Sequence, residues 1–117
     1  MGLYVGKEWY KLEFYPELCV SERPSERLDC AILQKNLLSA ILDIDDPRTS
    51  KRIDFAGGIR GLDYLVKRCD EDMVMAISMY PTSLDDLMAV ADSGDVMPPK
   101  STWFEPKLRS GILIHKF

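Results

Sequence analysis

The stretch of residues 97–111, MPPKSTWFEPKLRSG, holds the densest set of side chains that could bind a ligand. A lysine ammonium, an arginine fork and several hydroxyl donors are the groups that suit phosphate or another anion. Residues 98–111 carry three cations and one anion, within a chain whose net charge is −4. The pattern predicts an anion-binding loop whose ligand-binding side chains are Lys100, Ser101, Thr102, Lys107, Arg109 and Ser110.

A structural role for the same loop stays open. Pro98 and Pro99 favour an extended entry and remove two N–H donors. Trp103 and Phe104 could plug the open end of the core, and Glu105, a secondary candidate for the site, could pair with a neighbouring cation. The Lys-Ser-Thr triplet is not a P-loop, because no GxxxxG precedes it and no helix is expected after it. Two interpretations therefore remain, a ligand site and a structural lid.

Gly57 and Gly58 form a second candidate site, since they stand between an expected strand and an expected helix. The free N–H groups of a helix N-terminus can hold a phosphate. The spacing with Gly61 is not GxGxxG, however, and no acidic residue follows at the place where a dinucleotide-binding unit needs one. A tight strand-to-helix turn is the favoured interpretation.

No catalytic residue and no metal site is predicted. His115 is the only histidine, and a lone histidine in a strand is more often a surface or packing residue than a base. The three cysteines include no CxxC pair, which argues against a zinc site. The acidic cluster of residues 43–46 lacks the glycine and the closing glutamate of a calcium loop. The sequence names no cofactor.

Length and composition bound the class of protein. The 117 residues fit one domain, with 46% hydrophobic and 29% charged residues. The acidic balance argues against nucleic acid as a partner, because a nucleic-acid groove needs clustered Lys and Arg. No apolar run approaches the roughly 20 residues needed to cross a membrane, and no signal peptide is evident at the start. We expect a cytoplasmic protein with three reduced cysteines.

The expected elements follow the order ββαβαβα-loop-β. Residues 3–14 read as a hairpin with its turn at Gly6-Lys7, and residues 52–58 as a short strand. Residues 73–80, an unbroken apolar run, read as a central strand covered on both faces, and residues 111–117 as the closing strand. The strand, helix and strand between residues 52 and 80 would form a right-handed crossover. The predicted fold class is α+β, a mixed sheet with about three helices packed on it.

Three helices are expected at residues 28–44, 59–69 and 83–93. The first should be capped by Asp29, and its very apolar face implies burial on two sides or a partner surface. The second should bury its apolar spacing from Ile59 onward. The third should begin with a capping box, after Thr82 or Ser83, and end at Gly94. Its apolar stripe comprises Leu84, Leu87, Met88 and Ala91.

Three segments carry a resemblance to a known family: LDCAILQKNLLSAIL, RIDFAGGIRGLDYLV and the long run from MYPTSLDDL to SGILIH. They resemble the C-terminal part of the DUF ten-fifteen family, a group of uncharacterised bacterial and archaeal proteins. The resemblance covers nearly the whole chain, from the WYKL hairpin to the last strand. Its specific signature is MPPKSTWFEPKLRSG.

The resemblance implies a C-terminal domain, a fragment of a longer protein. Full-length members carry an upstream Asp-Gly-His-His-Arg motif similar to those of the ParB/sulfiredoxin-like group, which includes free serine kinases. This chain lacks the motif. The resemblance therefore implies an accessory half of a nucleotide- or phosphate-using enzyme, with the upstream domain as its partner. The alternative is a folding module that forms a homodimer through its apolar first helix and binds no ligand.

Overall fold

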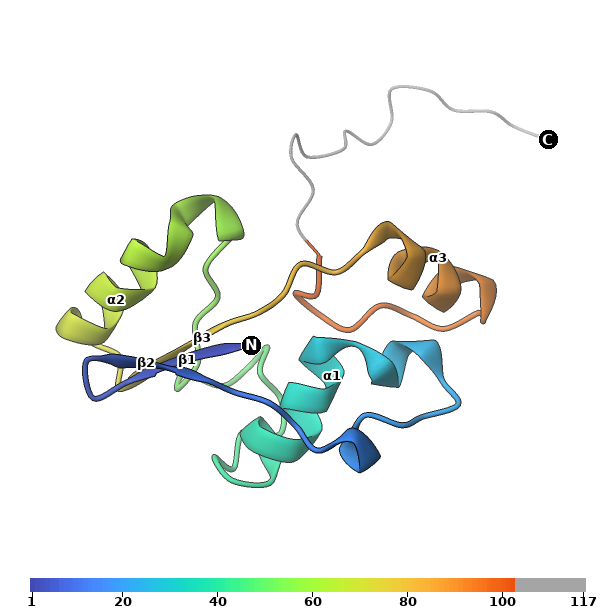
Figure 1. The fold of residues 1–117 in the computed structure, drawn as a ribbon, viewed down its shortest axis with the longest axis horizontal. Helices are drawn as coiled ribbons and strands as arrows, with labels where there is room; N and C mark the ends of the chain where they lie inside the picture. The colour runs from blue at the N-terminus through green and yellow to red at the C-terminus, as the bar shows by residue number, and fades with distance from the viewer. Residues whose placement is uncertain (103–117) are drawn as a thin grey trace.

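The computed structural model describes residues 1–102 of the chain. This part contains three strands and three α-helices, joined by turns and short helical segments (Figure 1). The α+β class predicted from the sequence is confirmed. The elements are β1 (Gly2–Val5), β2 (Glu8–Lys11), α1 (Asp29–Leu33), α2 (Gly61–Glu71), β3 (Met75–Ser78) and α3 (Leu84–Asp92).

The β1–β2 hairpin forms as predicted, around a two-residue turn at Gly6 and Lys7. Both residues have positive φ, 59° and 68°, which is the signature of a type I′ turn. This turn matches the right-handed twist of the strands and pairs Val5 with Glu8. Its register places the rings of Tyr4 and Trp9 5.1 Å apart between centroids.

The sheet has the order β2-β1-β3, and both of its ladders are antiparallel. The predicted mixed sheet is therefore wrong for the described residues, and so is the crossover between residues 52 and 80. Residues 52–58 form no strand. One local competitor is Asp54, whose carboxylate accepts a hydrogen bond from the N–H of Phe55 and so offers the backbone an alternative to a ladder. The predicted closing strand, residues 111–117, lies outside the described residues.

β3 begins two residues later than expected and lies at an edge of the described sheet, with β1 in the centre. Its four side chains are all half-buried, Ile77 among them, although the sequence predicted a strand covered on both faces. On one side of the molecule α2 packs beside β3 (Figure 1). At the other end α1 and α3 are bridged by the short helical segment Pro24–Arg27, which contacts both.

The α-helical part of the first helix is shorter than predicted, and a π-helical turn follows it. α1 begins at Asp29, so Asp29 is its first residue and not its cap. It continues into a π-helical turn, Gln34–Ser39, in which the Asn36 side chain donates to the carbonyl of Ile32, 2.9 Å away. A side chain that occupies a helix carbonyl competes with the backbone donor for it. The wider turn moves the buried position to Leu38, which is 8% exposed, and leaves Ile41 70% exposed.

The main core cluster lies between this first helix and the sheet. Its buried members are Leu33, Leu38 and Ile44. The partly buried side chains packed against it are Met1, Leu12, Phe14, Leu37, Leu42, Ile53 and Ile77. Burial of this kind contributes roughly 25 cal/mol for each Å² of apolar surface removed from water. The apolar face of the first helix is thus largely used inside the chain.

α3 has the predicted start but not the predicted buried stripe. Ser83 accepts a hydrogen bond from the N–H of Asp86, and the Asp86 carboxylate accepts one from the N–H of Ser83. The side chain that this helix buries is Val90, which is 1% exposed. Leu84 and Met88, expected to be inside, are 69% and 54% exposed. The helix is therefore turned relative to the predicted orientation.

Candidate functional site

The structure describes five of the predicted site residues: Lys100, Ser101, Thr102, Gly57 and Gly58. The other four, Glu105, Lys107, Arg109 and Ser110, lie outside the described residues. The geometry of the candidate loop can therefore be followed from its start at Met97 as far as Thr102.

The loop opens with a tight turn from Pro98 to Ser101. The Ser101 N–H donates to the Pro98 carbonyl at 3.4 Å, and the Ser101 hydroxyl donates to the same oxygen at 2.7 Å. Lys100 has a φ of 61°, in the left-handed region. Proline at the second position and positive φ at the third are the pattern of a type II turn, whose third position normally holds Gly or Asn. A lysine there strains the backbone, at a cost of roughly 1–2 kcal/mol.

The end of this turn is tied to the connection between β3 and α3. The Thr82 hydroxyl donates to the Ser101 carbonyl at 2.8 Å. The neighbouring N-terminus of α3 is satisfied by its own capping box, in which Asp86 faces the first N–H groups. This helix end is therefore no anion site, and the Ser101 hydroxyl is engaged within its own turn. Of the described loop side chains, Lys100 is the cation offered to solvent.

Lys100 and the second candidate segment lie close together. The Lys100 ammonium stands 5.9 Å from the centre of the Phe55 ring, a cation–π arrangement. Phe55 is 44% exposed and lies two residues before Gly57. The structure thus brings the start of the 97–111 loop to the segment that carries Gly57 and Gly58, a proximity that spacing in the sequence could not show.

Gly57 and Gly58 do not lead directly into a helix. They enter a 3-10 turn, Gly58–Arg60, closed by a bond from the Arg60 N–H to the Gly57 carbonyl at 3.0 Å. α2 begins after it at Gly61, whose φ of 72° suits glycine. The glycine pair therefore lies in a tight turn before α2, although no strand precedes it as the favoured interpretation expected.

An ion cluster fixes the segment beneath Lys100. Arg68 on α2 donates to Asp54 at 2.6 Å and to both oxygens of Asp72, at 2.9 and 3.0 Å. These hydrogen bonds lower the pKa of both carboxyl groups and raise the pKa of Arg68. Asp54 directly precedes Phe55, and its carboxylate also accepts a hydrogen bond from the Phe55 N–H at 2.8 Å.

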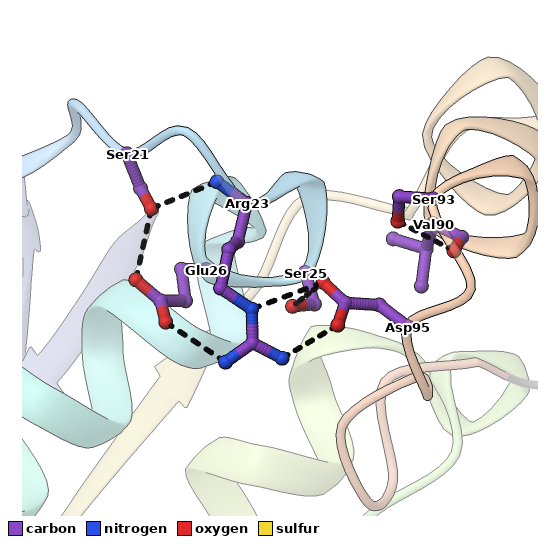
Figure 2. Close-up of polar contacts among 7 residues, drawn as sticks. All are labelled: Ser21, Arg23, Ser25, Glu26, Val90, Ser93 and Asp95. Carbon is purple, nitrogen blue, oxygen red and sulfur yellow. Dashed lines mark hydrogen bonds and ion pairs between the residues drawn. The ribbon is translucent and has the colours of Figure 1, made fainter.

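A second ion cluster, missed at the sequence level, lies before the loop (Figure 2). The Asp95 carboxylate accepts hydrogen bonds from the Ser25 hydroxyl at 2.8 Å and from the Arg23 guanidinium at 3.3 Å through Nε. Both hydrogen bonds lower the pKa of Asp95, the one from Arg23 more strongly. Arg23 also reaches Glu26 at 3.5 Å. No local pattern could reveal the pair, since Arg23 and Asp95 stand 72 residues apart.

These contacts anchor the described start of the candidate loop on both sides. Asp95, two residues before Met97, is held by the first part of the chain, and Ser101 is held by Thr82. Within residues 1–102 the arrangement can present one ammonium beside an aromatic ring, and it brings no nucleophile and base together. Across residues 1–102 no cluster of three or more His, Cys, Asp or Glu side chains could hold a metal ion. Cys19, Cys30 and Cys69 form no disulfide.

The helices of residues 1–102 include none with the length and apolar character needed to cross a membrane. Comparisons of the chain with protein-family models, with curated proteins and with solved structures find no match.

Proposed function

We propose that this chain is an accessory domain of a nucleotide- or phosphate-using enzyme, and that residues 97–111 are its anion-binding loop. Catalysis belongs to an upstream domain of a longer cytoplasmic protein, which is the partner of this domain. The proposal follows the resemblance to the DUF ten-fifteen family, and its physical support is the conformation of Lys100.

The strained backbone of Lys100 supports this role, because glycine could adopt the same conformation without strain. A turn that served packing alone would be more stable with Gly or Asn at this position. Strained residues cluster at binding sites, where the surrounding structure holds them in place. Here Pro98, Ser101 and Thr82 hold the turn, and the ammonium projects beside the Phe55 ring. Because lysine at this position strains the backbone, its presence supports a role for the positive charge of its side chain.

The proposed ligand is an anion attached to a flat ring, such as a nucleotide. A phosphate bound to Lys100 would lie near Phe55, which is 44% exposed, and a ligand ring could contact this aromatic side chain. Lys107, Arg109 and the hydroxyl of Ser110 would add donors from the second half of the loop. Each hydrogen bond to a charged group contributes about 1.5–3 kcal/mol.

The alternative, a homodimerisation module with no ligand, has less support. It assigned the interface to the apolar face of the first helix. Ile32, Leu33 and Leu38 are buried within the chain itself, and Ile41 is the large apolar side chain that this segment leaves exposed.

The experiment is a titration of the 117-residue chain with ATP and, separately, with inorganic phosphate, followed by amide chemical shifts and calorimetry. The informative variant is Lys100→Gly, which removes the ammonium and suits positive φ. Lys7→Gly is the matched control, because Lys7 also has positive φ but lies in the β1–β2 turn. Lys100→Arg retains the charge.

We expect ATP to shift the amides of residues 100–102 and of Phe55. Lys100→Gly should bind about tenfold or more weakly, as expected for the loss of one charge-assisted hydrogen bond. Lys7→Gly and Lys100→Arg should bind like the wild type. Equal affinity of Lys100→Gly and wild type, or no response of the wild-type chain to either ligand, would contradict the proposal and leave the loop as a structural lid.

A further inference from the structure

A cavity of about 320 Å³ lies beside α1, lined by residues outside the 97–111 loop. All of its lining residues fall between Leu18 and Asn36, in the segment before α1, in α1 itself and in the π-helical turn that follows it. Pockets that bind small molecules begin at roughly 300 Å³. The cavity is therefore large enough for a small ligand, and it is separate from the anion site proposed above.

One part of the cavity lining is apolar, and it consists of Leu18, Val20, Ala31 and Ile32. Ile32 is buried, whereas Leu18 and Val20 are 45% and 81% exposed. These two large side chains thus remain in contact with water at the cavity. Because removal of apolar surface from water is favourable, the site would gain from a ligand with an aliphatic group that covers them.

Glu26 brings an oriented carboxylate to the cavity (Figure 2). One of its oxygens accepts a hydrogen bond from the Ser21 hydroxyl at 2.8 Å, and that hydroxyl oxygen accepts one from the Arg23 N–H at 3.1 Å. The Arg23 guanidinium lies 3.5 Å from the other carboxylate oxygen, but it also pairs with Asp95. One guanidinium therefore serves two carboxylates, and the cluster keeps a negative charge.

Lys35 and Asn36 line the cavity from the π-helical turn Gln34–Ser39, a kind of turn that is frequent at functional sites. The Asn36 side-chain nitrogen donates to the Ile32 carbonyl at 2.9 Å, which leaves the amide oxygen of Asn36 as an acceptor. Lys35 takes part in none of the ion pairs within residues 1–102. The cavity lining thus combines one cation and one anion that are not paired with each other.

We propose that this cavity binds a small zwitterion with an aliphatic side chain, the chemical class of the apolar α-amino acids. The ligand carboxylate pairs with Lys35 and the ligand ammonium with Glu26, while the aliphatic group covers Leu18 and Val20. A simple anion is a poorer match because Glu26 repels it, and a simple cation is a poorer match because Lys35 repels it. The proposal does not depend on the function proposed for the 97–111 loop.

An NMR titration of the 117-residue chain tests this with L-leucine, isocaproate, isoamylamine and glycine. Isocaproate is leucine without its amino group, isoamylamine is leucine without its carboxyl group, and glycine lacks the aliphatic group. Leucine should give saturable shifts at the amides of residues 18–21 and 31–36. It should bind about two- to fivefold more tightly than either single-charge probe, as expected for one exposed ion pair. Glycine, without the apolar contact, should bind most weakly.

Two charge-removing variants assign the partners of the ligand. Lys35→Gln should weaken the binding of leucine and isocaproate by about two- to fivefold and leave that of isoamylamine unchanged. Glu26→Gln should weaken the binding of leucine and isoamylamine by a similar factor and should not weaken that of isocaproate. Lys67→Gln is the matched control, because Lys67 lies on α2, which contributes no residue to the cavity. It should bind all four probes like the wild type.

Three results would overturn the proposal. The first is the absence of a saturable shift at the lining residues with leucine. The second is binding of isocaproate or isoamylamine as tightly as leucine, which would indicate a site for a singly charged or purely apolar ligand. The third is an unchanged leucine affinity in both Lys35→Gln and Glu26→Gln. If a variant lost the spectrum of the folded chain, the four titrations of the wild type would decide.

Discussion

Lys7 and Lys100 both have positive φ, a backbone conformation that lysine rarely adopts. Lys7 shares its turn with Gly6, in a hairpin that demands positive φ at both positions. Lys100 follows two prolines, which limit the unfolded chain and hold the turn. In each case the neighbours enforce a conformation that the lysine itself does not favour.

The first prediction is that Lys100→Gly is more stable than Lys100→Ala, by about 0.5–1 kcal/mol. Both variants lose the contact with Phe55, but alanine keeps the backbone strain of roughly 1–2 kcal/mol, and glycine loses part of that gain through its larger unfolded-state entropy. Urea denaturation of the pair measures the difference. Equal stability would show that position 100 does not have positive φ in solution.

The second prediction concerns Asp95 and pH. Arg23 and Ser25 lower the pKa of this carboxyl group in the folded chain, so its contribution to stability is present above the unfolded value of about 3.9. The contribution is lost as pH falls through the lower folded value. Wild type should therefore exceed Asp95→Asn in melting temperature near pH 7, and the gap should shrink below about pH 4.

Thermal unfolding between pH 7 and pH 2.5 measures this gap. Asp92→Asn, at an exposed carboxylate on the last residue of α3, is the control and should show a smaller gap at neutral pH. A gap for Asp95→Asn that is the same at every pH would mean that the side-chain shape, and not the charge, is responsible.

At the scale of the element, α3 is the helix whose start is best determined. Ser83 and Asp86 satisfy orphan N–H groups of the first turn reciprocally. We predict that Ser83→Ala lowers the free energy of unfolding by about 1 kcal/mol, because the cap is lost, while Ser83→Thr stays close to wild type. Urea midpoints compare the three proteins. If Ser83→Ala unfolded at the wild-type midpoint, the capping box would not form in solution.

The elements that sequence reasoning found are those with a local signal. The Gly6-Lys7 turn and the capping box of α3 each depend on residues within a few positions of one another, so their patterns could be read directly. Residues 52–58 form no strand, and there the Asp54 side chain bonds both the adjacent N–H and Arg68 on α2. The second of these contacts is non-local, and no alternation of apolar residues reports it.

The candidate site follows the same division. Residue types made the 97–111 loop a candidate, but the strain at Lys100 and the approach to Phe55 are properties of the folded chain. The Asp95 cluster depends on a contact across 72 positions and has no local signature. The orientation of α3 was mistaken for a related reason, since several of its faces carry apolar residues and only tertiary packing selects Val90.

For the whole molecule, the cluster around Leu33, Leu38 and Ile44 joins the first helix to the hairpin and to β3. We predict that Leu38→Ala lowers the free energy of unfolding by about 2–5 kcal/mol, through lost burial and a cavity. Ile41→Ala, at an exposed apolar residue of the same segment, should change it by less than about 0.5 kcal/mol.

Denaturant unfolding of the two variants makes a matched comparison, because each loses an aliphatic side chain of equal size three residues apart. The reverse order, with Ile41→Ala the more damaging, would mean that Ile41 and not Leu38 faces the core in solution.

Because each bond of the π-helical turn spans one residue more than an α-helical bond, residues 34–39 accommodate a surplus residue. Deletion of Lys35 would leave Leu33 and Leu38 four positions apart, which in an ordinary α-helix is the same side. Elsewhere, within α2 for instance, one deletion would rotate every later side chain by about 100°. The tolerance for a change in chain length is therefore concentrated at one site in the first helix, where the core would keep its register with one residue fewer.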